Sequence, residues 1–306
     1  MAEATIVIVT KDREDDLRIA IRSSLMQEGD LEVLVIDDGS SDGSADMVAR
    51  EFPGVRLLRT AESIGYIRQR NRAAGEATSP VLVSIDDDCE FTAADTVAAT
   101  LARFGHPRVA AVTMPFVQAR RGGDVLRRAP SPDGVWVTSI FPGGAHAIRR
   151  DVFLAVGGYR PSMGHILEDA ELSMRLLGHG YVVRLGHVES PVLHHESSVR
   201  DPRRDVTFIV RNHAMLAFLH VPFPFVVERL ARVGAYAVWN ATRWRAPRQV
   251  GAGILGALRE IARHPRDRRP LSRPLYRAFR AMRDGHAPLA EIEPLLPPPR
   301  SSVPGG

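Results

Sequence analysis

Short apolar runs alternate with helical patterns over the first hundred residues of the chain. Each run is rich in β-branched and aliphatic residues, which predicts a strand, and each is followed by apolar residues at helical spacing. The runs are ATIVIVT at 4–10, EVLVID at 32–37, VRLLR at 55–59 and PVLVSI at 80–85. Strands separated by helices pair in parallel through crossovers, and runs without strict alternation suit a sheet covered on both faces. The pattern therefore predicts an α/β fold with a mainly parallel central sheet.

The pattern changes twice further along the chain. From about residue 109 the alternation loosens, and a compact unit with strand and helix signals extends to about residue 200. Beyond that point the pattern is helical and interrupted by prolines, and the last residues are rich in proline. We therefore predict an α/β domain at 1–202, a helical extension at 203–290 and a flexible tail at 291–306.

Composition narrows the class of protein. The single cysteine, Cys89, excludes an intrachain disulfide and a cysteine-based zinc cage, which favours a reducing compartment. No basic region precedes an apolar stretch at the N-terminus, and no apolar segment reaches the roughly 20 residues of a membrane-spanning helix. The expectation is a cytoplasmic protein without a signal peptide or a transmembrane helix.

The net charge of +4 hides an uneven distribution. Residues 241–283 contain twelve arginines against Glu260 and Asp267, a net charge of +10, which leaves −6 for the rest of the chain. The helices expected there fit either ordinary packing on a domain or peripheral docking on anionic lipid at the inner face of the cell membrane. Nucleic acid is not expected as a partner, because no reading motif is present and few aromatics interleave with the arginines.

Three adjacent carboxylates follow the fourth apolar run, in SIDDDCEF at 84–91. Adjacent carboxylates raise each other's pKa and cost stability unless a cation relieves them. Asp86 and Asp88 offer two hard oxygen ligands on one side of an extended segment, which suits Mg²⁺ or Mn²⁺ bridging a diphosphate. The alternative is a solvated loop in which one aspartate caps the next helix.

Three other segments carry candidate chemistry, each with a structural alternative. Asp38 ends a strand in VIDDGSSDGS, where it could cap the next helix or accept a hydrogen bond from a nucleobase. Glu168 and Asp169 lie in the first turn of a helix predicted at 167–180, where the helix dipole stabilises acidic side chains whatever their role. A carboxylate at this position could also serve as a general base. His194 in VLHHES is either structural or a metal ligand that favours Mn²⁺.

Seven segments in order resemble the family 2 glycosyltransferases of GT-A fold, over roughly residues 4–200. They are VIVTKDR, VIDDGSSDGS, IGYIRQRN, SIDDDCEF, GGAHAIRRDVFLAVGGYRP, ILEDAELSMRLLGHGY and VLHHES. The resemblance implies inverting transfer of a sugar from a UDP-, dTDP- or GDP-sugar to an acceptor hydroxyl, usually with Mn²⁺ or Mg²⁺. It leaves open whether the acceptor is a glycan, a lipid-linked molecule or a small molecule.

The resemblance also implies roles for individual residues. Asp169 matches the catalytic base and Glu168 its acidic neighbour, while Asp86 and Asp88 match the Asp-x-Asp metal site that His194 completes in some members. The residues that match the nucleotide and donor site are Thr10, Asp12, Arg13, Asp38, Arg68, Arg70, Asp86, Asp87, Gly143 and Gly144.

Other functions remain open at this point. The chain could be a non-catalytic nucleotide-sugar-binding or membrane-adaptor protein, or a sugar nucleotidyltransferase. A dehydrogenase is disfavoured because no G-x-G-x-x-G follows the first strand, and a P-loop kinase is disfavoured because G-x-x-x-x-G-K-[ST] is absent.

Overall fold

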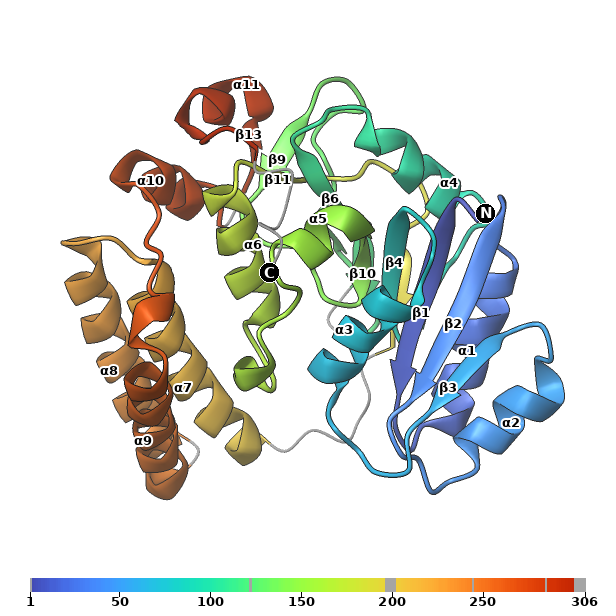
Figure 1. Cartoon of the computed structure of the whole chain (residues 1–306), viewed down its shortest axis with the longest axis horizontal. Coiled ribbons are helices and arrows are strands. Elements are labelled where there is room, and N and C mark those ends of the chain that lie inside the picture. The colour runs from blue at the N-terminus through green and yellow to red at the C-terminus, as the bar shows by residue number, and fades with distance from the viewer. Residues whose placement is uncertain (1, 121–122, 196–201, 244, 284, 300–306) are drawn as a thin grey trace.

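The computed structural model describes residues 2–120, 123–195, 202–243, 245–283 and 285–299. An α/β part built on a long twisted sheet lies beside a group of C-terminal helices (Figure 1). The sheet has nine strands. In spatial order they are β3 (Arg56–Arg59), β2 (Leu31–Asp37), β1 (Ala4–Thr10), β4 (Val81–Asp86), β10 (Ala145–Arg149), β6 (Val109–Thr113), β11 (Val182–Arg184), β9 (Trp136–Thr138) and β13 (Ala287–Pro288).

The first four strands of the chain pair in parallel, as the apolar runs predict. β1 lies between β2 and β4, and β2 also pairs with β3. β10 then runs antiparallel between β4 and β6, so the whole sheet is mixed. The predicted α/β class is confirmed.

Both faces of this sheet are covered by helices. Ile6 and Ile8 of β1 pack in one core with Leu17, whereas Val7 packs in a second core with Ile67 on the opposite face. Successive side chains of a strand point to opposite faces, so a run without polar positions is what two covered faces require. The helices of this part are α1 (Glu14–Leu25), α2 (Ser44–Glu51), α3 (Tyr66–Glu76), α4 (Thr96–Leu101), α5 (Arg150–Ala155) and α6 (Glu168–Gly178), with 3₁₀ turns at Ala102–Phe104 and Pro161–Met163.

A second, smaller sheet lies at the carboxyl end of β4. Its strands, in order, are β5 (Cys89–Glu90), β12 (Val192–His194), β7 (Phe116–Gln118) and β8 (Val125–Leu126). β5 follows β4 after two residues, and β12 comes from about a hundred residues later in the chain. The small sheet therefore brings the segment after β11 next to the three adjacent aspartates.

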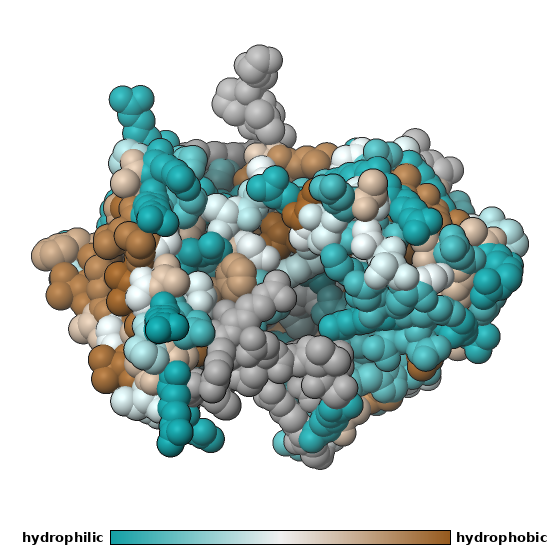
Figure 2. All heavy atoms as spheres, turned by 90° about the horizontal axis from the view of Figure 1, so that it is seen from below, coloured by the Kyte–Doolittle hydropathy of each residue, from teal (hydrophilic) through white to brown (hydrophobic). Residues whose placement is uncertain are grey.

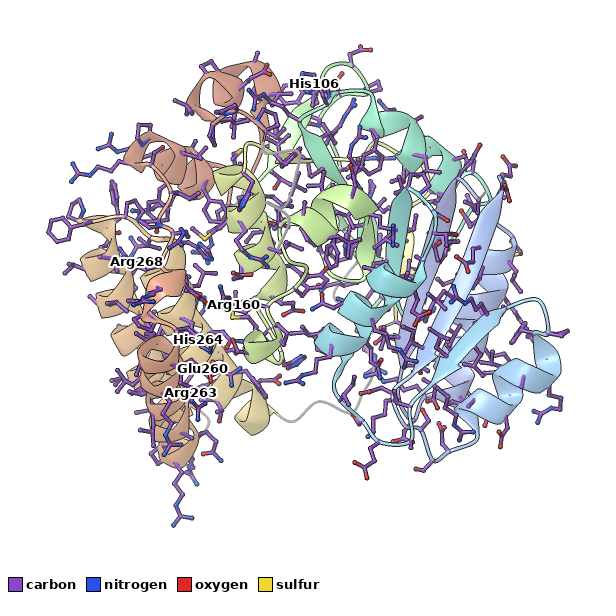
Figure 3. All side chains as sticks on the ribbon, viewed as in Figure 1. His106, Arg160, Glu260, Arg263, His264 and Arg268 are labelled. Carbon is purple, nitrogen blue, oxygen red and sulfur yellow. The ribbon has the colours of Figure 1, made fainter. Side chains whose placement is uncertain are left out.

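The C-terminal helices are held to the α/β part by a buried ionic network. They are α7 (Pro202–His220), α8 (Phe225–Arg243), α9 (Pro247–Arg263), α10 (Arg273–Ala281) and α11 (Leu289–Ile292), with 3₁₀ turns at Pro265–Asp267 and Glu293–Leu295. Glu171 of α6 is fully buried and accepts hydrogen bonds from Arg175 at 2.6 Å and from His220 at 3.0 Å. Arg160 adds an ion pair with Asp267 at 2.7 Å and lines a small cleft with Glu260 and His264 at the same junction (Figure 3).

The last residues that the structure describes are packed. β13 extends the sheet beside β9, and Ile292 and Leu296 are buried in the core that contains α6 and α10. Arg108 binds Glu293 at 2.9 Å and the carbonyl of Pro297 at 2.9 Å. Residues 291–299, in the segment for which the sequence predicts a flexible tail, are thus packed against the α/β part, and residues 300–306 lie outside the described part of the chain.

The apolar stripes of α8 and α9 face solvent instead of the core. Val238 and Trp239 of α8 are 66% and 51% exposed, and Leu258 of α9 is 58% exposed. Figure 2 shows this hydrophobic area over the two helices, at the left of the view. Among the described helices, none is both long enough and apolar enough to cross a membrane.

Candidate active site

The carboxyl ends of β1 and β4 form the floor of the candidate site. The two strands are in parallel register with Val9 opposite Asp86, so Thr10 and the aspartates that follow β4 lie side by side. Ligands of open α/β sheets gather at such strand ends.

Arg13 neutralises part of the triple carboxylate. Its Nη1 donates to Asp87 Oδ1 at 2.8 Å and to Asp88 Oδ2 at 3.2 Å, and the Thr10 hydroxyl donates to Asp87 Oδ2 at 2.9 Å. Burial raises the pKa of Asp87 to about 7, although Arg13 opposes the rise. Asp87 is thus held by the chain's own side chains, which leaves Asp86 and Asp88 as the carboxylates that can reach a cation.

Asp86 faces Arg70 and a glycine turn. Arg70 of α3 is buried and its Nη2 donates to Asp86 Oδ1 at 2.5 Å. Burial alone would lower the pKa of Arg70, but Asp86 and the other acidic groups nearby outweigh burial and raise it. A Cβ on Gly144 would collide with the Asp86 carboxyl group, and one on Gly143 would lie 2.9 Å from both Arg70 and Asp169. The turn at Gly143 and Gly144 is therefore packed closely against Asp86, Arg70 and Asp169.

Four side chains after β4 and in β12 could hold a metal ion. One ligand atom each from Asp86, Asp88, Cys89 and His194 lies within 4.8 Å of the others. His194 pairs with Cys89 across β12 and β5, which sets its Nε2 3.3 Å from Asp88 Oδ1. Two carboxylates and an imidazole suit Mn²⁺ or Mg²⁺. Burial raises the pKa of the Cys89 thiol well above its ordinary value, and hard ions such as Mn²⁺ and Mg²⁺ prefer oxygen ligands to sulfur.

Asp169 lies in the first turn of α6, on the other side of the glycine turn. Its Oδ1 is buried and accepts no hydrogen bond from the described residues, while Tyr159 bonds to the same carboxyl group. Burial and the neighbouring Glu168 raise the pKa of Asp169 well above its ordinary value, against the opposing effect of Arg70. Glu168 is itself bonded by the Tyr66 hydroxyl. The arrangement gives one carboxylate of increased proton affinity facing the site.

The backbone before Asp169 is strained and is held from α7. Ile166 and Leu167 have φ values of +67° and +70°, which is unusual for residues other than glycine and an outlier for a β-branched one. Asn212 of α7 is fully buried, and its Nδ2 donates to the carbonyls of Met163, His165 and Ile166 at 2.7–2.8 Å. The C-terminal helices therefore fix the segment that carries the candidate base.

The structure does not bring every predicted residue into the site. Asp38 accepts four hydrogen bonds, from Ser63, Ile64, Gly65 and Gln69, at 2.6–3.0 Å. A carboxylate has about four acceptor positions, so Asp38 is fully used in holding the loop before α3. A direct contact from Asp38 to a base would displace one of these donors.

Two further predicted residues lie at the edge of the site. Asp12 is exposed and bonds the backbone of Ser41 at 2.7 Å. Arg68 is exposed. It lies two residues before Arg70 in α3, so the two side chains point to different sides of the helix. The geometry favours Arg70 over Arg68 as the basic residue near the donor. Sequence reasoning missed Tyr66, Tyr159 and Asn212, although both tyrosines lie inside the quoted segments IGYIRQRN and GGYRP.

A comparison with protein families decides the assignment. The family model described as "Glycosyl transferase family 2" matches residues 5–168, more than half of the chain and the whole stretch from β1 to the start of α6. The chain belongs to this family. The predicted family and its GT-A-type fold are confirmed.

Curated relatives of this glycosyltransferase are also glycosyltransferases or polysaccharide biosynthesis proteins. N-acetylglucosaminyl-diphospho-decaprenol L-rhamnosyltransferase of Mycobacterium tuberculosis is 28% identical over 224 residues, which cover 58% of this chain and 72% of the relative. Succinoglycan biosynthesis protein ExoU of Rhizobium meliloti is 29% identical over 137 residues, covering 42% of this chain and 40% of the relative.

Solved structures share the fold. A mannosyltransferase from Pyrobaculum calidifontis, solved with GDP-Man and Mn²⁺, matches with a TM-score of 0.59 at 23% identity, over 84% of this chain and 75% of its own. GalNAc-T7, solved with UDP, GalNAc and Mn²⁺, matches with a TM-score of 0.59 at 18% identity, over 73% of this chain and 49% of its own. At these identities the likeness establishes the fold of this glycosyltransferase and nothing finer.

Proposed function

We propose that this glycosyltransferase transfers a sugar from a nucleotide diphosphate donor to an acceptor hydroxyl in a single displacement with inversion. The observation that carries the proposal is the glycine turn at Gly143 and Gly144. Asp86, Arg70 and Asp169 all contact this turn or lie where a side chain on it would be. In this proposal the leaving diphosphate lies beside Asp86 and Arg70, and the base, Asp169, contacts the other end of the same turn.

Asp169 acts as the general base in this proposal. Its raised pKa gives the carboxylate a greater affinity for the proton of an acceptor hydroxyl as the oxygen attacks the anomeric carbon. Tyr159 orients the carboxyl group, and Asn212 holds the backbone before it. Glu168 is bonded by Tyr66 and supports the first turn of α6.

Asp86, Asp88 and His194 would hold a divalent metal, with Mn²⁺ or Mg²⁺ as the fitting ions. When bound there, the ion neutralises negative charge that develops on the leaving diphosphate. Arg70 and Arg13 contribute fixed positive charge at the same strand ends and keep the carboxylates in place. EDTA should abolish transfer and added Mn²⁺ should restore it; full activity in EDTA would contradict the metal site.

We further propose a lipid-linked acceptor reached from an anionic membrane surface. The exposed apolar stripes of α8 and α9 are bordered by exposed arginines such as Arg248 and Arg259. Apolar burial together with attraction to anionic lipid is what holds interfacial helices on a membrane. The mycobacterial relative supports this proposal, because its name includes a diphospho-decaprenol acceptor.

A panel of nucleotide sugars tests the donor proposal. A donor that binds the folded state should raise the melting temperature, and the effect should need Mn²⁺ or Mg²⁺. With the stabilising donor and a lipid-linked acceptor, the enzyme should release a nucleoside diphosphate. Release of pyrophosphate would instead identify a sugar nucleotidyltransferase, and stabilisation without any turnover would favour a non-catalytic binding protein.

A further inference from the structure

A pocket of about 220 Å³ opens between α6, α7, α8 and α10, apart from the strand-end site. Aromatic rings form much of its wall, from Phe225 of α8 and from Tyr276 and Phe279 of α10. Its volume exceeds the roughly 30 Å³ share of one water molecule several times, so it can take a group larger than a single small ion. No role for this pocket follows from the sequence motifs.

Arginines dominate the polar lining of this pocket. Arg229, Arg232, Arg280 and Arg283 line it, and Glu228 is the one carboxylate among its described lining residues. Glu228 is already used, because it pairs with Arg280 at 2.9 Å and with Arg232 at 2.7 Å. The lining therefore carries an excess of positive charge, with neither Arg229 nor Arg283 paired to a carboxylate in the described part of the chain.

Arg229 has unsatisfied hydrogen-bonding capacity. Its Nη2 donates to His213 Nδ1 at 2.7 Å, while its Nε is buried and makes no hydrogen bond with any described residue. Burial lowers the pKa of Arg229 against the opposing effect of Tyr276, and the nearby Arg283 and Arg232 lower it further. A half-buried guanidinium without an anionic partner is costly unless an anion joins it, and phosphate oxygens match its planar donors.

This pocket shares its inner wall with the candidate active site. Leu167 and Ala170 line the pocket, and they flank Glu168 and Asp169 in the first turn of α6. Ile140 also lines it, two residues before the Pro142 to Gly144 turn that faces Asp86. A molecule whose anionic group lies in the pocket is therefore separated from the base by one turn of helix.

The outer side of the pocket leads to the exposed apolar surface. Phe225, which lines the pocket, begins α8, and Val227 and Leu230, in the first two turns of this helix, are 60% and 45% exposed. From there the apolar stripe continues along α8 to Trp239 (Figure 2). An amphiphile could place its anionic group among the arginines and its hydrocarbon along this stripe.

We propose that the pocket binds the phosphate or diphosphate group of a lipid-linked acceptor, with Arg229 and Arg283 as its principal ligands. This inference rests on the proposed function and names the acceptor class for the same active site. It assigns the arginines a role in acceptor binding that is separate from donor binding at Asp86 and Asp88.

Kinetics with matched acceptors test the pocket. Arg229→Gln should raise KM for a sugar linked to a polyprenyl diphosphate by about tenfold or more, the loss expected for one charge-assisted hydrogen bond. KM for the same sugar as an uncharged alkyl glycoside should not change. Arg50→Gln removes the same charge from the exposed surface of α2, away from the C-terminal helices, and should leave KM for the diphosphate acceptor within about twofold.

Direct binding separates this inference from the proposed function. Geranyl diphosphate and inorganic pyrophosphate are titrated into the protein in EDTA, so that a metal at the donor site does not contribute. Geranyl diphosphate should bind the wild type at least tenfold more tightly than Arg229→Gln or Arg283→Gln, and more tightly than pyrophosphate. Arg283 is exposed, so its substitution keeps the test valid if Arg229→Gln misfolds.

Two outcomes would overturn the inference. Equal binding of geranyl diphosphate to the wild type and to folded variants would remove the arginines as ligands, and equal affinity for pyrophosphate would identify a site for free phosphate groups. Failure of every nucleotide sugar to stabilise the protein would count against the proposed function alone. Loss of geranyl diphosphate binding in the variants would in that case still support an anionic lipid pocket.

Discussion

Arg13 and Arg70 together form hydrogen bonds with all three adjacent carboxylates of the site. Arg13 donates to one oxygen each of Asp87 and Asp88, and Arg70 donates to one oxygen of Asp86. The positive charges that the sequence pattern calls for are thus partly supplied by the chain itself. The remaining oxygens of Asp86 and Asp88 lie beside His194, where a divalent ion would complete the neutralisation.

Asp169→Asn should lower kcat by about 10²–10⁴-fold while nucleotide affinity stays near normal, because an amide cannot accept the acceptor proton. Donor affinity is read from thermal stabilisation, and turnover from release of the nucleoside diphosphate. Asp15→Asn on the exposed face of α1 provides the control and should behave as wild type. Full activity of Asp169→Asn would remove Asp169 as the base.

The pH profile follows from the direction of the Asp169 shift. The base must be deprotonated, and its pKa is raised by burial and Glu168, so activity should fall as the pH drops through that raised pKa. The acid limb of kcat/KM should therefore lie above the ordinary aspartate range near 3.9. An acid limb at or below that range would contradict the raised pKa.

Gly144→Ala should weaken donor binding and turnover together. The added methyl group would collide with the Asp86 carboxyl group, which is needed both for Arg70 and for the metal. Gly75→Ala in α3 meets nothing within 4 Å and should be neutral or slightly stabilising, so it controls for the substitution itself. Unchanged donor stabilisation and turnover in Gly144→Ala would mean that the turn is not close to the donor.

At the scale of elements, α7 matters as much to the site as the strands that carry its carboxylates. Its Asn212 and Arg211 bond four carbonyls of the segment before α6, at residues 162, 163, 165 and 166. These contacts stabilise two consecutive residues in the left-handed region. A helix outside the family-model match thereby positions the proposed base, Asp169, which directly follows the last matched residue.

Asn212→Leu should lower kcat by tenfold or more while donor affinity changes little. The carbonyls that Asn212 bonds would lose their hydrogen-bond donor, and the strained segment before Asp169 would no longer be held in place. Asn240→Leu gives the matched control. Asn240 is also buried, in α8, but among the described residues its side chain bonds only the carbonyl of Tyr236 in its own helix. Both variants should lower the melting temperature, and only Asn212→Leu should lower kcat; equal kcat in the two folded variants would reduce Asn212 to a structural role.

At the scale of the whole molecule, charge and apolar surface are concentrated on the C-terminal helices. α8 and α9 turn their apolar stripes to solvent, while α10, β13 and α11 return to the α/β part and complete its sheet and core. Removing everything after residue 201 would therefore remove part of that core as well as the exposed surface. Point substitutions are the sharper test of membrane binding.

Replacing Trp239 and Leu258 together by Ser should reduce binding to vesicles that contain anionic lipid several-fold, because both side chains are exposed on the apolar stripes. Binding of the wild type should weaken with added salt, which screens the arginines. Met26→Ser, directly after α1, removes a similarly exposed apolar side chain elsewhere and should not affect sedimentation with vesicles. Unchanged binding of the double variant, or equal binding to neutral vesicles, would count against the proposal.

Local pattern was enough for the strands and for the positions of the carboxylates. The strands β1, β2 and β4 can be predicted from runs of neighbouring residues. The aspartates at the ends of these strands can be predicted as site residues because ligand sites in parallel sheets lie at the carboxyl ends of strands. Contacts between segments that lie far apart in the sequence could not be predicted from local pattern. Arg13 with Asp87 and Asn212 with Ile166 join residues 74 and 46 positions apart.

By itself, the sequence determined the α/β class, the order of the family segments and the residue types available for a metal, a base and a diphosphate. The tertiary structure alone decided that α8 and α9 face solvent, that residues 291–299 are packed and that four arginines surround one pocket. The physical reason is that helical periodicity marks an apolar stripe without naming what covers it. Which distant segment meets a given side chain depends on the packing of the whole chain.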